Sequence, residues 1–152
     1  MTGQVFEFEH GYAHDLRGMP MAVREKLDRT GIRASRKQWQ ALPLPERQAL
    51  LEMPCATHAE SQLWRGKLVE LLKAFSDVPV EETTPVDPTL WVMPHHCPSE
   101  IAAQCALKKV PVPSQAQWGT LTPLQRFSLL KLSRSERQNR DFLPAMKEFG
   151  LA

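Results

Sequence analysis

Apolar residues between Thr57 and Phe75 recur at the spacing of a helix. Leu63, Leu68, Leu71, Leu72 and Phe75 fall on one broad stripe with a period of 3.6 residues. The stretch opens with Thr57-x-x-Glu60, in which each side chain can accept a hydrogen bond from the other residue's backbone N–H. This pattern predicts a capped amphipathic helix whose leucine stripe faces a core.

A longer pattern of apolar and polar positions occurs twice. Residues 35–53 read SRKQWQALPLPERQALLEM, and residues 114–132 read SQAQWGTLTPLQRFSLLKL, 79 positions later. Seven of these nineteen aligned positions are identical, where about one match is expected by chance. The identical pairs are Ser35/Ser114, Gln38/Gln117, Trp39/Trp118, Leu42/Leu121, Arg47/Arg126, Leu50/Leu129 and Leu51/Leu130. We interpret the two passages as copies of one helical unit of about fifty residues.

Both copies carry the same signal for the start of a helix. Ser35-x-x-Gln38 and Ser114-x-x-Gln117 are capping boxes, and a tryptophan follows each of them. They predict two short helices placed alike. The next helix in the second copy has the stronger start, because Thr122 can cap it and Pro123 suits its first position.

The N-terminal residues VFEFE show the alternation of a strand rather than that of a helix. Phe6 and Phe8 would share one face, opposite Glu7 and Glu9. One strand cannot form a sheet alone, so we expect an extended arm that docks on the helices. The alternative is a strand edge offered to a second chain.

Five prolines fall within residues 77–98, DVPVEETTPVDPTLWVMPHHCP. Proline lacks a backbone N–H and disfavours the helical conformation in the residue before it. We therefore predict an extended, proline-rich connector between two helical halves. It carries Trp91, Val92 and Met93, so we expect it to pack along the body of the protein.

Together these signals predict an all-α fold with one domain over residues 1–152. Its parts are an N-terminal arm (1–19), a first helical unit (20–76), the connector (77–98) and a second helical unit (99–152). Each copy leaves an apolar stripe that needs covering, and two similar units can cover one another about a pseudo-twofold axis.

Composition narrows the function without identifying it. Hydrophobic residues make up 42% of the chain, and 19 basic and 17 acidic residues give a net charge of +2. The charges are well mixed, which argues against a nucleic-acid-binding protein. No signal peptide and no apolar run of membrane-spanning length are visible, so we expect a cytoplasmic protein that does not contact the membrane. The oligomeric state is left open.

Cysteine and histidine residues supply the strongest candidate for metal chemistry. His95, His96 and Cys97 are consecutive, and Cys55 and His58 form a smaller Cys-x-x-His group. Zinc binds such ligands, but no Cys-x-x-Cys pair is present and adjacent ligands rarely serve one structural metal. We expect no metal and no cofactor. No nucleotide-binding or nucleophile motif points to catalysis either.

The repeated arginines, Arg47 and Arg126, each precede two leucines of the apolar stripe by three and four residues. Their aliphatic stems therefore lie beside the core, and their guanidinium groups can reach outward. We expect a salt bridge or a carbonyl contact that joins helices. The alternative is a pair of arginines that binds an acidic partner.

Several segments resemble one small bacterial family, that of conserved nitrate-reductase-associated proteins. The most specific are LTPLQRFSLLKLSR and NRDFLPAMKEFGL, and the resemblance runs from Phe6 to Leu151. It implies a gene close to those for assimilatory nitrate reductase. It carries over no catalytic residues, because none are established for the family.

The resemblance and the missing catalytic motifs favour a non-enzymatic accessory protein that binds nitrate reductase or a related nitrate-assimilation protein during maturation. Two alternatives stay open. One is a small metal-dependent enzyme or factor that uses the His95-His96-Cys97 region, and the other is an anion-sensing regulator of nitrate assimilation.

Two segments are expected to contact the protein partner, because the repeated helices are occupied with one another. Both carry residue types that are frequent at interfaces. The candidate contact residues are Phe6, Phe8, Tyr12 and Arg17 in the arm, and Trp91, Val92 and Met93 in the connector.

Overall fold

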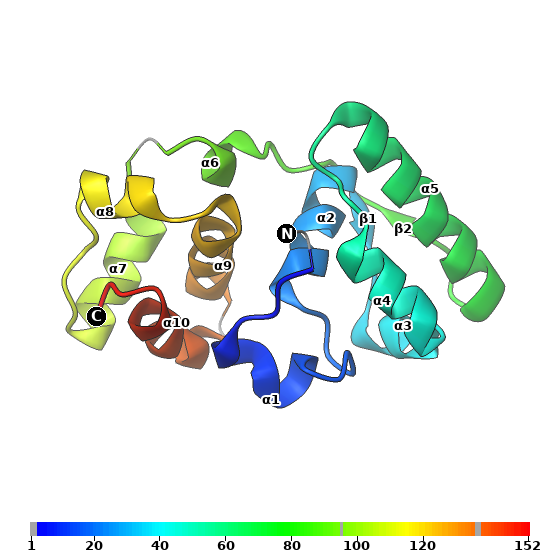
Figure 1. Ribbon diagram of the computed structural model, residues 1–152, viewed down its shortest axis with the longest axis horizontal. Coiled ribbons are helices and arrows are strands. Elements are labelled where there is room, and N and C mark those ends of the chain that lie inside the picture. Colours follow the sequence, from blue (N-terminus) through cyan, green and yellow to red (C-terminus); the bar gives the residue numbers. More distant parts are fainter. Residues whose placement is uncertain (1–2, 95, 136–137) are drawn as a thin grey trace. The chain divides into compact units, whose positions relative to one another are not determined.

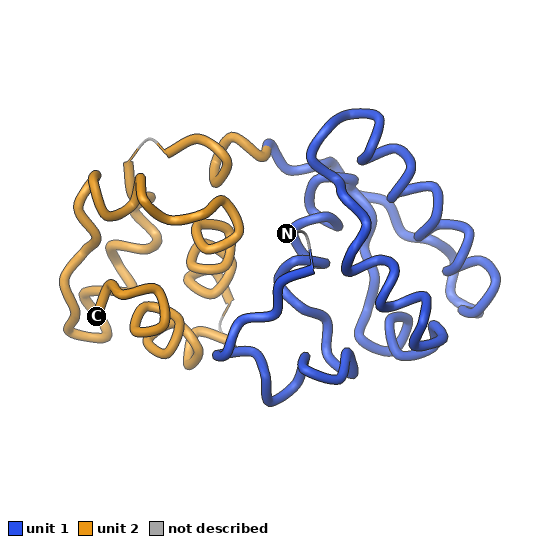
Figure 2. Tube along the Cα trace, viewed as in Figure 1, with its two compact units in different colours: residues 1–87 blue, residues 88–152 orange. Residues whose placement is uncertain are grey.

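The computed structural model describes residues 3–94, 96–135 and 138–152, which are mostly helical (Figure 1). The predicted all-α class is confirmed at that level, with one small two-stranded sheet added. The chain divides into two compact units, residues 1–87 and 88–152 (Figure 2). Packing of the two copies about a pseudo-twofold axis stays a prediction, and so does the single-domain organisation.

Unit 1 is built from helices and a short antiparallel strand pair. Its elements are the 3₁₀ helix η1 (Glu7–Glu9), α1 (His10–Ala13), α2 (Met21–Thr30), β1 (Ile32–Arg33), α3 (Arg36–Ala41), α4 (Leu44–Glu52), α5 (His58–Phe75) and β2 (Glu81–Glu82). Strand β1 pairs antiparallel with β2, in a register that places Ile32 opposite Glu82.

Unit 2 is arranged around its longest helix, α9, which contacts α6, α7 and α10 (Figure 1). The elements of unit 2 are α6 (Thr89–Val92), α7 (Ser99–Lys108), α8 (Gln115–Thr120), α9 (Pro123–Arg134), η2 (Asn139–Asp141) and α10 (Phe142–Glu148). The buried face of α9 includes Phe127, Leu129, Leu130 and Leu132.

The helix predicted after Thr57 forms as α5, and its capping box is present. The Glu60 N–H donates to Thr57 Oγ1 over 3.1 Å, and the Thr57 N–H donates to Glu60 Oε1 over 2.9 Å. The predicted stripe is partly wrong, because Leu63 and Phe75 are 70% and 47% exposed. The buried face is instead formed by Trp64, Leu68 and Leu72. Trp64 takes this place because its indole N–H donates to Leu50 O over 2.9 Å.

The extended N-terminal arm is a wrong prediction for residues 7–13, which form η1 and α1. The reason lies in Glu9, whose side chain is completely buried. Its Oε2 accepts from the Phe6 N–H over 3.1 Å, which closes the chain into a turn. Its Oε1 accepts from the Met21 N–H over 2.8 Å, at the start of α2. An alternating pattern cannot reveal that a glutamate caps a distant helix.

The predicted connector is also not extended throughout. Residues 89–92 form α6, which starts after Pro88 and ends before Pro94. Proline is tolerated at the start of a helix, where its missing N–H has no intrahelical partner in any case. The earlier part of the stretch does lie along the body of unit 1, since the Thr83 N–H donates to Gly31 O over 2.8 Å.

The two copies of the repeat fold alike. Helices α3 and α8 have capping boxes with the same geometry, 3.1 and 2.9 Å between Ser35 and Gln38 and between Ser114 and Gln117. Trp39 and Trp118 are both buried. Each short helix is followed by a longer one, α4 or α9, and only α9 has a side-chain cap, from Thr122. The stronger start predicted for the second copy is therefore confirmed.

Arg47 and Arg126 use their guanidinium groups in equivalent ways. Arg47 Nε donates to Leu42 O over 3.1 Å, and Arg126 Nη1 donates to Leu121 O over 2.6 Å. Leu42 and Leu121 are the matching residues that end α3 and α8. The arginine of each copy thus satisfies the carbonyl at the end of the helix before it, which is the carbonyl contact expected from the sequence.

Each arginine also donates a hydrogen bond to a backbone carbonyl earlier in the chain. Arg47 Nη1 donates to Leu16 O over 2.9 Å, and that carbonyl also accepts from Trp39 Nε1 over 2.7 Å. Leu16 has a φ of 62°, which is unfavourable for a residue with a Cβ. Two donors on its carbonyl hold the chain in this conformation.

Replacing Arg126 by Met should lower the free energy of unfolding of unit 2 by about 3 kcal/mol, because several buried carbonyls lose a charged donor. Arg47→Met should lower that of unit 1 by only about 1–2 kcal/mol, since Leu16 O keeps the Trp39 indole. Urea unfolding followed by tryptophan fluorescence measures both. Arg140→Met, at an exposed position, is the matched control. Equal effects of all three variants would contradict the role assigned to the guanidinium groups.

Candidate partner-binding surface

Helix α6 carries the predicted contact residues of the former connector. Trp91 is 1% exposed, and its ring packs edge-on against Phe127 of α9, with 5.0 Å between the ring centroids. Trp91 therefore anchors α6 to unit 2 from the inside. In this conformation its side chain is not available to a partner.

Arg126 fixes the backbone of α6 as well. Its Nε donates to Trp91 O over 2.7 Å, and its Nη2 donates to Val92 O over 3.2 Å. The same guanidinium group donates to Trp118 O over 3.1 Å at the end of α8. One buried side chain thus joins α6, α8 and α9. A four-residue helix could not stay ordered alone, so α6 depends on these bonds.

Apolar residues are exposed on and just after α6. Leu90 and Met93 are 46% and 43% exposed, and Pro94, which follows the helix, is exposed as well. Leu90 and Met93 are three residues apart, which places them on the same side of a helical turn. Pro94 lies close to Gly119 of α8, where an added Cβ would be 4.0 Å from Pro94 Cβ. We call Leu90, Met93 and Pro94 the α6 surface.

The predicted contact residues of the N-terminal segment are mostly part of unit 1. Phe6 is buried and stacks on the half-buried Phe8, with ring centroids 5.6 Å apart. Tyr12 is half-buried, and its carbonyl accepts from the Gly18 N–H. The Arg17 side chain is exposed and pairs with Asp15 over 2.8 Å.

The predicted contact residues therefore differ in solvent exposure. Arg17 and Met93 are exposed, Phe8, Tyr12 and Val92 are half-buried, and Phe6 and Trp91 are buried. Within unit 2, Val92 and Met93 lie beside Leu90 and Pro94, which were not among the predicted contact residues. The spacing of Leu90 and Met93 was a usable signal, but only if residues 89–92 had been recognised as a helix.

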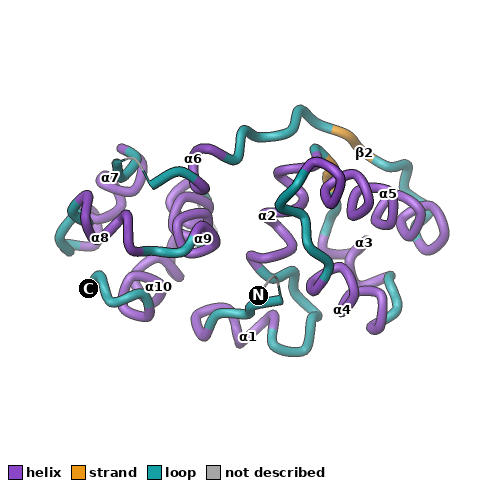
Figure 3. The backbone as a smooth tube through the Cα atoms, turned by 45° about the horizontal axis from the view of Figure 1, so that its top comes forward, coloured by secondary structure: helices purple, strands orange, loops and turns teal. Residues whose placement is uncertain are grey.

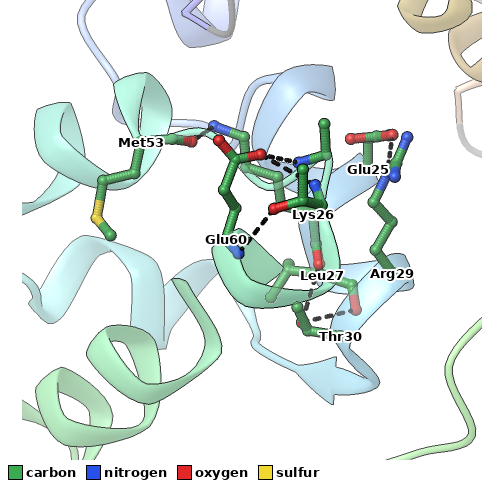
Figure 4. A network of polar contacts seen from close by, with 9 residues as sticks. Glu25, Lys26, Leu27, Arg29, Thr30, Met53 and Glu60 are labelled. Atoms are coloured by element: carbon green, nitrogen blue, oxygen red, sulfur yellow. Dashed lines mark hydrogen bonds and ion pairs between the residues drawn. The ribbon is translucent and has the colours of Figure 1, made fainter. Parts of the chain in front are cut away.

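Cys55 of the Cys55–His58 group is buried close to a polar centre formed by Lys26. Lys26 is 3% exposed, and its ammonium group lies beside Met53, to whose carbonyl it donates over 2.6 Å (Figure 4). It also donates to Leu51 O over 2.7 Å. A third bond, of 3.2 Å, reaches Leu50 O. These carbonyls end α4, so the lysine caps the C-terminus of that helix.

Burial controls the protonation of this centre. It lowers the pKa of Lys26 to about 8, and it raises the pKa of the Cys55 thiol to about 11, a rise to which Glu25 adds. His58 is exposed at the start of α5. A thiol that stays protonated at neutral pH is a poor nucleophile, so Cys55 is not poised for covalent chemistry.

The second candidate group is only partly described. His95 lies outside the described residues. His96 is exposed, and burial raises the pKa of the half-buried Cys97 to about 11, with a further contribution from Cys105. In the described part of the chain, no three His, Cys, Asp or Glu side chains gather closely enough to hold a metal ion. The absence of a metal in the protein stays a prediction.

None of the helices in the described ranges has the length and apolar character needed to cross a membrane.

The model of one protein family, described as conserved nitrate reductase-associated protein, matches residues 5–149. Searches of curated proteins and of solved structures found no match.

The free energy of unfolding should depend on pH through Lys26. The unfolded chain keeps the lysine proton up to pH about 10.5, whereas the folded chain releases it near pH 8. Between these values the unfolded state binds more protons, so the contribution of Lys26 to stability should rise with pH, by about 2 kcal/mol between pH 7.5 and pH 10. Urea unfolding of the wild type and of Lys26→Met at pH 7.5 and pH 10 isolates this contribution. The predicted pH dependence is contradicted if the difference in free energy of unfolding between the wild type and Lys26→Met is the same at both pH values.

Proposed function

The chain belongs to the family of conserved nitrate reductase-associated proteins, and we propose that it is a non-enzymatic accessory protein that binds nitrate reductase directly. The family description supports the association. The observation that carries direct binding is the α6 surface, on which Leu90 and Met93 are 46% and 43% exposed although the backbone of α6 is held by Arg126.

Rigid attachment makes the α6 surface suitable for binding. Association costs conformational entropy whenever flexible groups become ordered. Trp91 and Arg126 already hold the backbone of α6, so a partner has to order little more than the Leu90 and Met93 side chains. Methionine is enriched in protein interfaces, and single exposed leucines become informative when they cluster with it.

Arg17 is the exposed charge of the second predicted contact segment. Its backbone is held, because Gln40 Nε2 donates to Arg17 O over 2.9 Å. The side chain extends outward with Asp15 as its ion-pair partner. Exposed ion pairs contribute little to folding, so Arg17 can exchange Asp15 for a carboxylate on nitrate reductase at small cost. In this proposal Phe6 and Phe8 support the segment rather than contact the partner.

The proposed stage of binding is the maturation of nitrate reductase, before its cofactors are in place. An accessory protein for that stage needs a contact surface but no catalytic site of its own. The protonated Cys55 and Cys97 thiols agree with such a role, because neither is prepared for group transfer.

The double variant Leu90→Glu/Met93→Glu should weaken binding to purified nitrate reductase by roughly tenfold or more, because two carboxylates would be desolvated in an apolar contact. Calorimetry or surface binding assays with cofactor-free and cofactor-loaded nitrate reductase measure the dissociation constants, and the cofactor-free form should bind more tightly.

The matched control is Leu107→Glu, at a leucine that is 72% exposed on α7 of the same unit. It should change the dissociation constant less than twofold. The direct-binding proposal fails if the double variant binds as the wild type does while both proteins keep the same melting temperature. It fails equally if Leu107→Glu weakens binding as strongly.

A further inference from the structure

Residues 81–86 cross unit 1 as an exposed, acidic segment just before the chain enters unit 2. They follow α5 and contain β2 (Figure 3). Residues 81–85 are all exposed, and only Val86 is half-buried. This segment therefore contributes almost no apolar surface to the core of unit 1, and other forces must hold it there.

Two ion pairs hold the acidic end of the segment. Arg33 Nη1 of β1 lies 3.3 Å from Glu81 Oε1, and Arg65 of α5 pairs with Glu82. The side chains of Arg33 and Glu81 are 67% and 65% exposed. Ion pairs between exposed side chains are weak and are screened by salt.

Backbone bonds hold the rest of the segment. Beyond the short β1–β2 pairing, the Thr83 N–H donates to Gly31 O and the Val86 N–H donates to Asp28 O, both over 2.8 Å. Gly31 has a φ of 73°, and an added Cβ there would lie only 3.0 Å from the Pro85 ring. The segment thus fits closely against the end of α2, while its own mostly exposed side chains add little to the apolar core.

We propose that residues 81–86 form a releasable clasp, held by Arg33 and Arg65, that sets how much free chain joins the two units. When the clasp is closed, the chain is fixed as far as Val86, two residues before unit 2 begins at Pro88. When it opens, all residues after α5, which ends at Phe75, become linker. The twelve residues 76–87 then span up to roughly 40 Å when fully extended.

Charge reversal tests the clasp in the full-length protein. NMR amide-exchange rates of Thr83 and Val86 report directly on the two backbone bonds that closing forms. In Arg33→Glu/Arg65→Glu, repulsion from Glu81 and Glu82 should raise both rates by roughly tenfold or more. The full charge swap, with Glu81→Arg and Glu82→Arg added to that variant, restores both pairs with opposite signs and should return the two rates towards the wild-type values.

Lys73→Glu, a single charge reversal at an exposed position of α5, the helix that carries Arg65, is the control and should change both rates less than twofold. The clasp is overturned if Thr83 and Val86 exchange at wild-type rates in Arg33→Glu/Arg65→Glu. It is overturned as well if the Leu68 and Leu72 amides of α5 accelerate by the same factor, because unit 1 would then open as a whole.

Discussion

The ends of short helices impose the constraint on which the rest of this structure depends. Every α-helix leaves four N–H and four carbonyl groups without intrahelical partners, so short helices have a high proportion of such groups. Except for α5, with 18 residues, the α-helices of the described ranges have 4 to 12 residues. Burying them together is costly unless side chains satisfy their ends.

The chain satisfies these ends with two kinds of side chain. Serine and threonine caps at Ser35, Thr57, Ser114 and Thr122 serve the N-termini. Buried charged side chains serve three further ends. Glu9 accepts from the first N–H of α2, Lys26 donates to the last carbonyls of α4, and Arg126 donates to the end of α8. Such groups are costly to bury, and here their hydrogen bonds compensate for the loss of water.

The difference between local caps and caps from distant residues explains which elements could be predicted from the sequence. The serine and threonine caps act over three residues, so a local pattern reveals them, and the repeated Trp and Leu positions follow. Glu9 reaches Met21, and Arg126 reaches back to Trp91. No periodicity encodes contacts across 12 or 35 positions, and for that reason η1, α1 and α6 were predicted to be extended.

Prediction of the candidate site from the sequence was limited in the same way, because it too depends on contacts between distant residues. The sequence predicted the segment with Trp91 and Met93 as a contact region, but it did not predict which side chains of that segment are buried and which are exposed. The contacts that hold Trp91 inward and leave Leu90 exposed come from Arg126 and Phe127, more than thirty positions later in the chain. Stability and the proposed binding thus depend on one residue, because the Arg126 guanidinium that donates to the end of α8 also holds the backbone of α6.

Arg47 and Arg126 thus hold equivalent positions and contacts in the two copies of the repeat. NMR measurement of guanidinium Nε–H exchange with water tests it most directly, since Arg47 Nε donates to Leu42 O and Arg126 Nε to Trp91 O. Because both protons are held in hydrogen bonds, they should exchange at least about tenfold more slowly than those of exposed arginines such as Arg36 and Arg140. Equally fast exchange in all four side chains would contradict it.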